Sequence, residues 1–104
     1  MATGSQGDES ILSASVRVPE HVVYRDFADE TVILNLESGM YHGLNSTAAR
    51  MLQVLESSTT VAEAIDELAT EFDQPRETIE RDVVTLCRSL DDRGLIEHDA
   101  GRDG

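Results

Sequence analysis

The feature that most constrains this fold is a pair of short apolar segments that leads directly into a helical pattern. Residues 32–36 and 40–44 are separated by three residues ending in Gly39, and a short loop with glycine between two such segments is typical of a β-hairpin. Asn45 follows the second segment, and its side-chain oxygen can cap the first turn of a helix. We therefore expect a hairpin that turns straight into a helix, with the open edge of strand 40–44 carrying the function.

Alternating apolar residues predict the rest of a small sheet. Residues 22–24 read as a strand before the hairpin, which gives a three-stranded antiparallel meander. Residues 16–18 precede a proline and predict either a short strand or an extended lead-in. Residues 95–97 predict a short final strand.

Apolar residues spaced three and four apart predict three helices, over 46–55, 60–72 and 75–90. Thr60 and Glu63 have the spacing of a capping box at the start of the second helix, and Gly94 is placed to end the third. The expected fold class is therefore α+β and winged-helix-like, with a three-stranded antiparallel sheet followed by three helices.

A chain of 104 residues forms a single domain. Residues 1–15 contain few apolar groups and are expected to form a disordered N-terminal tail. The domain is expected over residues 16–97, and residues 98–104 read as a polar C-terminal tail.

The charge of the chain argues against several classes of partner. Eight basic residues, all arginine, stand against 21 acids and give a net charge of −13, whereas binding of nucleic acid normally needs a basic face. No apolar run is long enough to span a bilayer, and a single cysteine fits a reducing compartment. We expect a cytoplasmic protein that binds neither nucleic acid nor membrane.

The sequence contains no pattern typical of a catalytic or metal site. It has no Cys-x-x-Cys, no His-Glu-x-x-His and no glycine-rich phosphate loop, so we expect no enzyme activity and no cofactor. His42 is interpreted either as a half-buried strand residue or as a contact to a ligand. Cys87 lies on the apolar stripe of the third helix and is expected to be buried and inert.

Three parts of the chain together resemble the PqqD-like family of peptide-recognition elements. They are residues 38–45, the helix at 48–55, and the helix at 79–90 followed by Gly94-Leu95-Ile96. The resemblance implies a non-catalytic module that binds the leader of a ribosomally made precursor peptide as an added strand, on the edge of the third strand and against the third helix. It further implies delivery of that precursor to a leader peptidase or another modifying enzyme, and we favour the stand-alone type found in lasso-peptide clusters.

The residues expected to contact the peptide lie on the hairpin and on the third helix. They are Val32, Leu34, Met40, Tyr41, His42, Gly43, Asp82, Val83, Val84, Leu86 and Cys87. Cys87 and Met51 stand where the family more often has bulkier or aromatic side chains, so we expect a roomier pocket.

Three alternatives stay open on the sequence alone. The first is a PqqD-type chaperone for a radical-SAM peptide-modifying enzyme. The second is a winged-helix transcription regulator, although Glu77, Glu80 and Asp82 make the presumed recognition helix a poor match for DNA. The third is a weak homodimer formed through the open strand edge.

Overall fold

A computed structural model describes residues 11–99 of the chain and shows an α+β fold. In chain order its elements are β1 (Ser15–Arg17), β2 (Val22–Phe27), β3 (Glu30–Asn35), β4 (Tyr41–Leu44), α2 (Ser46–Ser57), α3 (Val61–Phe72), α4 (Arg76–Asp92) and β5 (Glu97–Asp99). The predicted three-stranded antiparallel sheet followed by three helices is therefore confirmed. None of these helices is both long enough and apolar enough to cross a bilayer.

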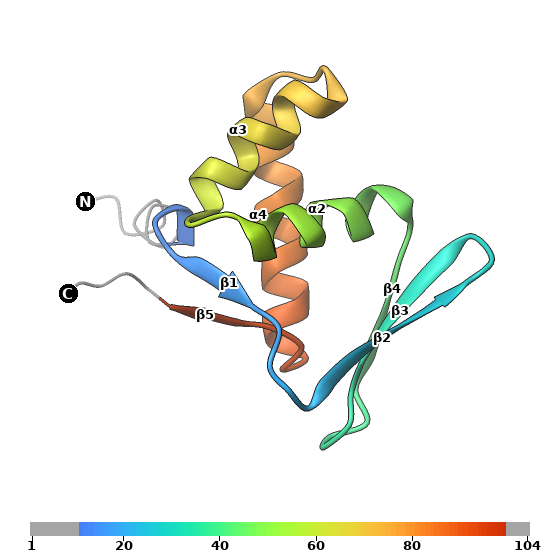
Figure 1. Ribbon diagram of the computed structural model, residues 1–104. Coiled ribbons are helices and arrows are strands. Elements are labelled where there is room, and N and C mark those ends of the chain that lie inside the picture. The colour runs from blue at the N-terminus through green and yellow to red at the C-terminus, as the bar shows by residue number, and fades with distance from the viewer. Residues whose placement is uncertain (1–10, 100–104) are drawn as a thin grey trace.

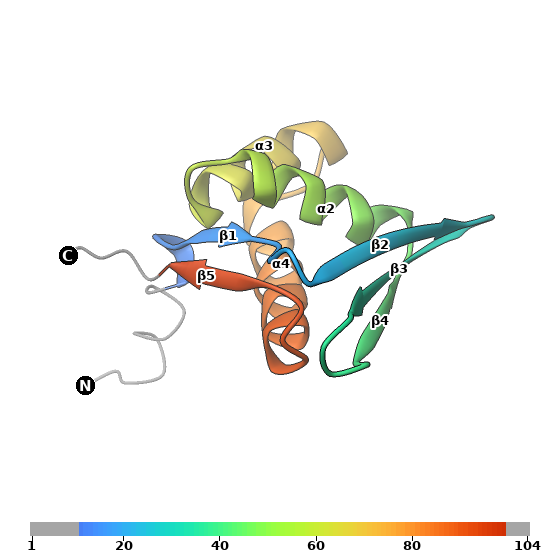
Figure 2. The same ribbon diagram turned by 60° about the horizontal axis from the view of Figure 1, so that its bottom comes forward.

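The strands form two antiparallel sheets. One has the order β2-β3-β4, and the other pairs β1 with β5 from opposite ends of the described chain, with Ser15 opposite Asp99. Both ribbon views place α4 between the two sheets (Figures 1 and 2). The final strand begins at Glu97, two residues later than expected, because Leu95 and Ile96 are buried in the core.

The predicted corner between strand and helix is present. The side-chain oxygen of Asn45 accepts the N–H of Ala48 at 2.8 Å and caps α2 one residue after β4 ends. Gly39 has a φ of +80°, as the hairpin loop requires. The direction of β4 is therefore tied to the start of α2 by the shortest connection in the domain between a strand and a helix.

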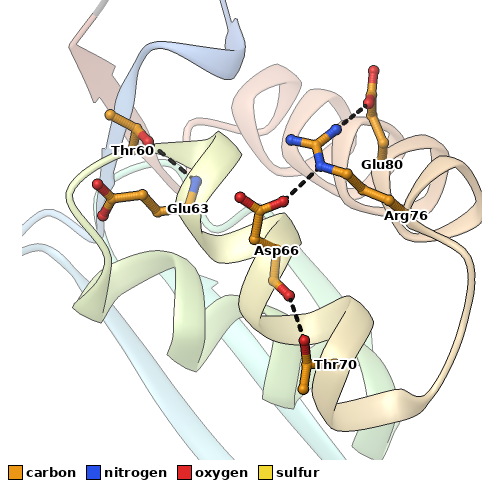
Figure 3. A network of polar contacts seen from close by, with 6 residues as sticks. All are labelled: Thr60, Glu63, Asp66, Thr70, Arg76 and Glu80. Atoms are coloured by element: carbon orange, nitrogen blue, oxygen red, sulfur yellow. Dashed lines mark hydrogen bonds and ion pairs between the residues drawn. The ribbon is translucent and has the colours of Figure 1, made fainter.

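The helices α3 and α4 are joined by a small polar network (Figure 3). Thr60 Oγ1 accepts the N–H of Glu63 at 3.2 Å, which is one of the two bonds of the predicted capping box. The carboxylate of Glu63 accepts the N–H of Thr59 at 3.2 Å, one residue before the position that the box requires. Arg76 Nε donates to Asp66 Oδ1 at 2.6 Å, and its Nη1 donates to Glu80 at 3.0 Å. The start of α4 is thereby held beside the middle of α3.

The C-terminus of α4 ends as predicted at Gly94, whose φ is +66°. Its N–H donates to the carbonyl of Asp91 at 3.0 Å, and the N–H of Leu95 donates to that of Leu90 at 2.9 Å, which together form a Schellman motif. Asn35, the only polar side chain buried among the described residues, donates from Nδ2 to the Gly94 carbonyl at 2.9 Å. This bond joins the end of β3 to the end of α4.

The core lies between the helices and the inner face of the β2-β3-β4 sheet. Ile33 and Leu44 come from that sheet, and Leu52, Leu68 and Leu90 come from the three helices; none of these side chains is exposed. Burial of such apolar surface is the main source of stability in a domain of this size.

The ends of the domain differ from the sequence-based boundaries. Ile11 and Leu12, expected in the N-terminal tail, pack against the core, and the carbonyl of Ala14 accepts the N–H of Val61 at 2.8 Å. At the other end, His98 and Asp99 belong to β5. Residues 1–10 and 100–104 of the two expected tails lie outside the described residues.

Candidate functional site

Strand β4 presents different residues on its two faces. In the pairing with β3, His42 lies opposite Ile33 and Tyr41 lies opposite Leu34. Because directly opposite residues point to the same face, His42 shares the inner face with the buried Ile33. Tyr41 and Gly43 lie on the outer face, away from the helices. The predicted contact residues of this strand therefore face two surfaces.

The far edge of β4 is open, since no strand in the described chain pairs with it. The N–H of Asn35 donates to the carbonyl of Met40 at 2.8 Å, which marks a hydrogen-bonded pair. Such pairs alternate along an antiparallel ladder, so the backbone groups of His42 face β3 and those of Tyr41 and Gly43 face the open edge. Two N–H groups and two carbonyls are thus presented to an extended partner.

A hollow of about 280 Å³ adjoins this edge on the inner side of the sheet. It lies between β4, the start of α2 and one flank of α4. Its lining residues are His42, Asn45, Thr47, Ala48, Met51, Asp82, Thr85, Leu86 and Ser89. Apolar atoms of Met51 and Leu86 therefore stand beside hydroxyl and carboxylate groups, which suits a side chain that is part apolar and part polar.

Two titratable side chains line the hollow, His42 and Asp82. Burial, and to a lesser degree the positive charge of Arg93, lower the pKa of His42, so its imidazole is neutral at pH 7 and both donates and accepts a hydrogen bond. The carboxylate of Asp82 forms no hydrogen bond or ion pair with any residue from 11 to 99. Asp82 can therefore contact a ligand without giving up an existing partner.

The structure corrects the predicted set on α4. Val83 and Cys87 are fully buried in the core and do not face the hollow. Val84 lies on the other flank of the helix, beside Arg81 and Arg88. Only Asp82 and Leu86 of the predicted helix residues line the hollow, because the apolar stripe itself packs against the core and leaves the neighbouring flank to form the wall.

Cys87 is buried, as expected. Burial, and to a lesser degree the negative charge of Asp91, raise the pKa of its thiol to about 12. Within residues 11–99, no group of His, Cys, Asp and Glu side chains is arranged to hold a metal ion.

Four of the other predicted residues form a surface on the outer face of the sheet. Val32 and Leu34 are half-buried there, beside Gly43 and Tyr41 of β4, and Tyr41 is 61% exposed. These four residues do not line the hollow, so an added strand would contact them with its outward side chains only. Met40 precedes β4 and lies opposite Asn35 on the inner side of the sheet; it is 47% exposed and does not line the hollow either.

Sequence reasoning missed Thr85 and Ser89 as lining residues. Together with Asp82 and Leu86 they follow the spacing i, i+3, i+4, i+7, which places all four on one face of a helix. That periodicity is present in the sequence, but a face with three polar residues also resembles ordinary solvent-exposed surface.

Comparison with known proteins gives a consistent result. The family model for coenzyme PQQ synthesis protein D (PqqD) matches residues 30–96. A PqqA binding protein from Gluconobacter oxydans (strain 621H) is 34% identical over 53 residues, which cover 51% of this chain and 55% of that protein.

Two solved structures share the fold. TbiB1 in complex with the TbiA(β) leader peptide is 31% identical, with a TM-score of 0.68, and the match covers 84% of this chain and 99% of that one. Lasso peptide synthetase B1 complexed with its leader peptide is 29% identical, with a TM-score of 0.70 and coverage of 80% and 98%. Because the family model matches residues 30–96, from the start of β3 to beyond the end of α4, this chain belongs to the PqqD family.

Proposed function

We propose that this protein binds the leader segment of a ribosomally made precursor peptide as an additional strand on the open edge of β4. One observation carries the proposal: the backbone groups of Tyr41 and Gly43 face the open edge, directly beside the hollow against α4. An extended peptide that pairs there satisfies these groups and places alternate side chains into the hollow.

Strand addition separates affinity from specificity. Backbone hydrogen bonds to β4 are available to any extended peptide without proline at the paired positions, so they contribute little selectivity. Side chains that point inward meet His42, Leu86 and the other lining residues, whereas side chains that point outward meet Tyr41. Selectivity for one leader therefore depends on these two surfaces.

The comparisons support a role as a binding module that serves a separate enzyme. Both similar structures are complexes with leader peptides, and the similar part of each covers at least 80% of this chain. The match to the PqqA binding protein covers a smaller share. We therefore favour the lasso-type assignment, in which the bound precursor is delivered to a leader peptidase, over a PqqD-type partnership with a radical-SAM enzyme. In either case the module itself is non-catalytic.

The proposal is tested by titrating the protein with a fluorescent copy of the leader encoded by the nearest precursor-peptide gene. A dissociation constant at or below about 1 μM is expected, which corresponds to about 8 kcal/mol of binding free energy. A scrambled peptide of the same composition is the matched control. Failure of this leader to bind better than the scrambled peptide, with the protein folded by circular dichroism, would overturn the proposal.

A second experiment tests strand addition itself. Each leader residue is N-methylated in turn, which removes one backbone donor without altering the protein. Because alternate N–H groups of an added strand face β4, methylation should weaken binding strongly at every second position and weakly between them. Equal tolerance at all positions would exclude pairing with the edge of β4.

A further inference from the structure

We propose that Glu30 makes the open edge of β4 selective for a leader that carries a lysine or arginine on the outward side of the added strand, beside Gly43. This inference rests on the proposed function and names the chemistry of the leader. The observation behind it is a close approach: a Cβ placed on Gly43 would overlap with Glu30 Oε2. The carboxylate of Glu30 therefore occupies the space that a side chain at position 43 would fill.

The register explains how the carboxylate reaches this position. Gly43 lies opposite Val32, and Glu30 lies two residues before Val32 on the same outer face of β3. Diagonal neighbours of this kind are within reach of a long side chain. Because glycine has no side chain, Glu30 extends across β4 toward the edge at which the peptide would pair, and Gly43 is one of the two residues whose backbone groups face that edge.

The carboxylate of Glu30 has no partner among residues 11–99. It forms no hydrogen bond or ion pair there, and Arg25, which shares the outer face, does not pair with it. The outward side chain of an added strand beside Gly43 would meet this carboxylate directly. A cationic side chain would gain an ion pair, whereas an acidic one would be repelled.

The inner side of the same edge carries the same sign of charge. Asp82 lines the hollow and is likewise unpaired within the described chain, and the whole protein has a net charge of −13. A basic leader would therefore be attracted over a distance and then paired at one position. Since Glu30 is exposed, this pair would change affinity by a small factor, about two- to fivefold at low salt.

The experiment measures binding of the same fluorescent leader to the full chain at about 50 mM and about 500 mM salt. The higher salt concentration screens exposed ion pairs. Glu30→Gln should weaken binding about threefold at low salt and have little effect at high salt. Glu67→Gln, on the distant helix α3, removes the same charge and is the matched control. Leader variants with each lysine or arginine replaced by glutamine should show the same loss at one position only.

A charge exchange provides the decisive comparison. Glu30→Lys should weaken the unaltered leader by more than Glu30→Gln does, and a leader with glutamate at the identified position should recover that loss. If both variants bind the leader as the unaltered protein does, Glu30 does not contribute to leader selectivity. The inference is then overturned while the proposed function stands. If no leader binds the unaltered protein, the proposed function is overturned and this inference with it.

Discussion

The sheet half of this domain, β2 to β4 with their loops, and the helical half, α2 to α4, differ in the amount of apolar side chain that they expose. All the large apolar side chains that are exposed within residues 11–99 lie on β2, β3, β4 or the adjoining loops; they are Tyr24, Phe27, Leu36, Met40 and Tyr41. The helices expose none of comparable size, and their surface includes paired arginines, such as Arg50, which bonds both carboxylate oxygens of Glu71 at 2.8 Å. Apolar exposure that folding does not need is typical of a contact surface, so we expect a partner to bind the sheet half.

The largest expected effect comes from comparing a substitution in the helical half, which should lower stability, with one in the sheet half, which should weaken leader binding. Leu68→Ala removes a fully buried side chain of α3 and should lower the free energy of unfolding by about 2–5 kcal/mol. Tyr41→Ala removes an exposed side chain and should change stability by less than about 0.5 kcal/mol, yet weaken leader binding about fivefold or more. Urea unfolding and peptide titration measure the two. A Tyr41→Ala protein that bound the leader normally would break the comparison.

The next effect concerns the residue that joins the halves. Asn35→Ala removes the donor to the Gly94 carbonyl and the acceptor of the Glu37 and Ser38 N–H groups, at 2.8 and 3.1 Å. Leaving such groups unpaired in a half-buried site should lower the free energy of unfolding by about 1–3 kcal/mol. Urea unfolding checks this, with Asn45→Ala as a comparison at an exposed cap. A loss below about 0.5 kcal/mol would mean that other contacts hold the halves together.

Two glycines offer a matched pair of smaller effects. Gly39 and Gly94 both have positive φ, but a Cβ on Gly39 would meet nothing, whereas one on Gly94 would lie 3.2 Å from Asn35 Nδ2. Gly39→Ala should therefore lower the free energy of unfolding by about 1 kcal/mol from the backbone alone, and Gly94→Ala by more. Thermal unfolding of the two variants side by side isolates the contact with Asn35. Equal losses would show that Asn35 moves aside freely.

The smallest effect is the pH dependence of the helical core. Burial raises the pKa of the Cys87 thiol to about 12, above its ordinary value near 8.5 in an unfolded chain. A raised folded pKa gives stability that is complete below the unfolded pKa and declines as pH rises above it. Between pH 8 and 9 the free energy of unfolding should fall by less than about 1 kcal/mol from this group. Cys87→Val should remove that part of the slope, and an unchanged slope would assign it elsewhere.

Most of this fold could be predicted from the sequence because its turns and helix ends are determined by neighbouring residues. Each of the turn and cap signals depends on residues within a few positions of each other. They are the loop ending in Gly39, the helix caps at Asn45 and Thr60, and the helix end at Gly94. The pairing of β1 with β5 joins residues that are 80 to 84 positions apart. No periodicity encodes such a pairing, which is why residues 11–15 were assigned to a tail.

The candidate site was predicted less completely than the fold. The two elements predicted from the sequence, β4 and α4, both border the hollow, but the apolar stripe of α4 does not form its wall. Val83 and Cys87 belong to this stripe and are fully buried in the core, because a helix in a small domain turns its most apolar face to the core. Which flank then borders β4 depends on the packing of the sheet against α4, and that geometry is absent from the sequence of either element.

The bond from Asn35 to Gly94 has one further consequence for a strongly acidic protein. An amide neither titrates near neutral pH nor carries a net charge, so this joint responds little to proton concentration or ionic strength. The charges of the carboxylates around the open edge are screened by salt. We therefore expect ionic strength to change how strongly a peptide is attracted to this edge, while the spacing between β4 and α4 stays constant.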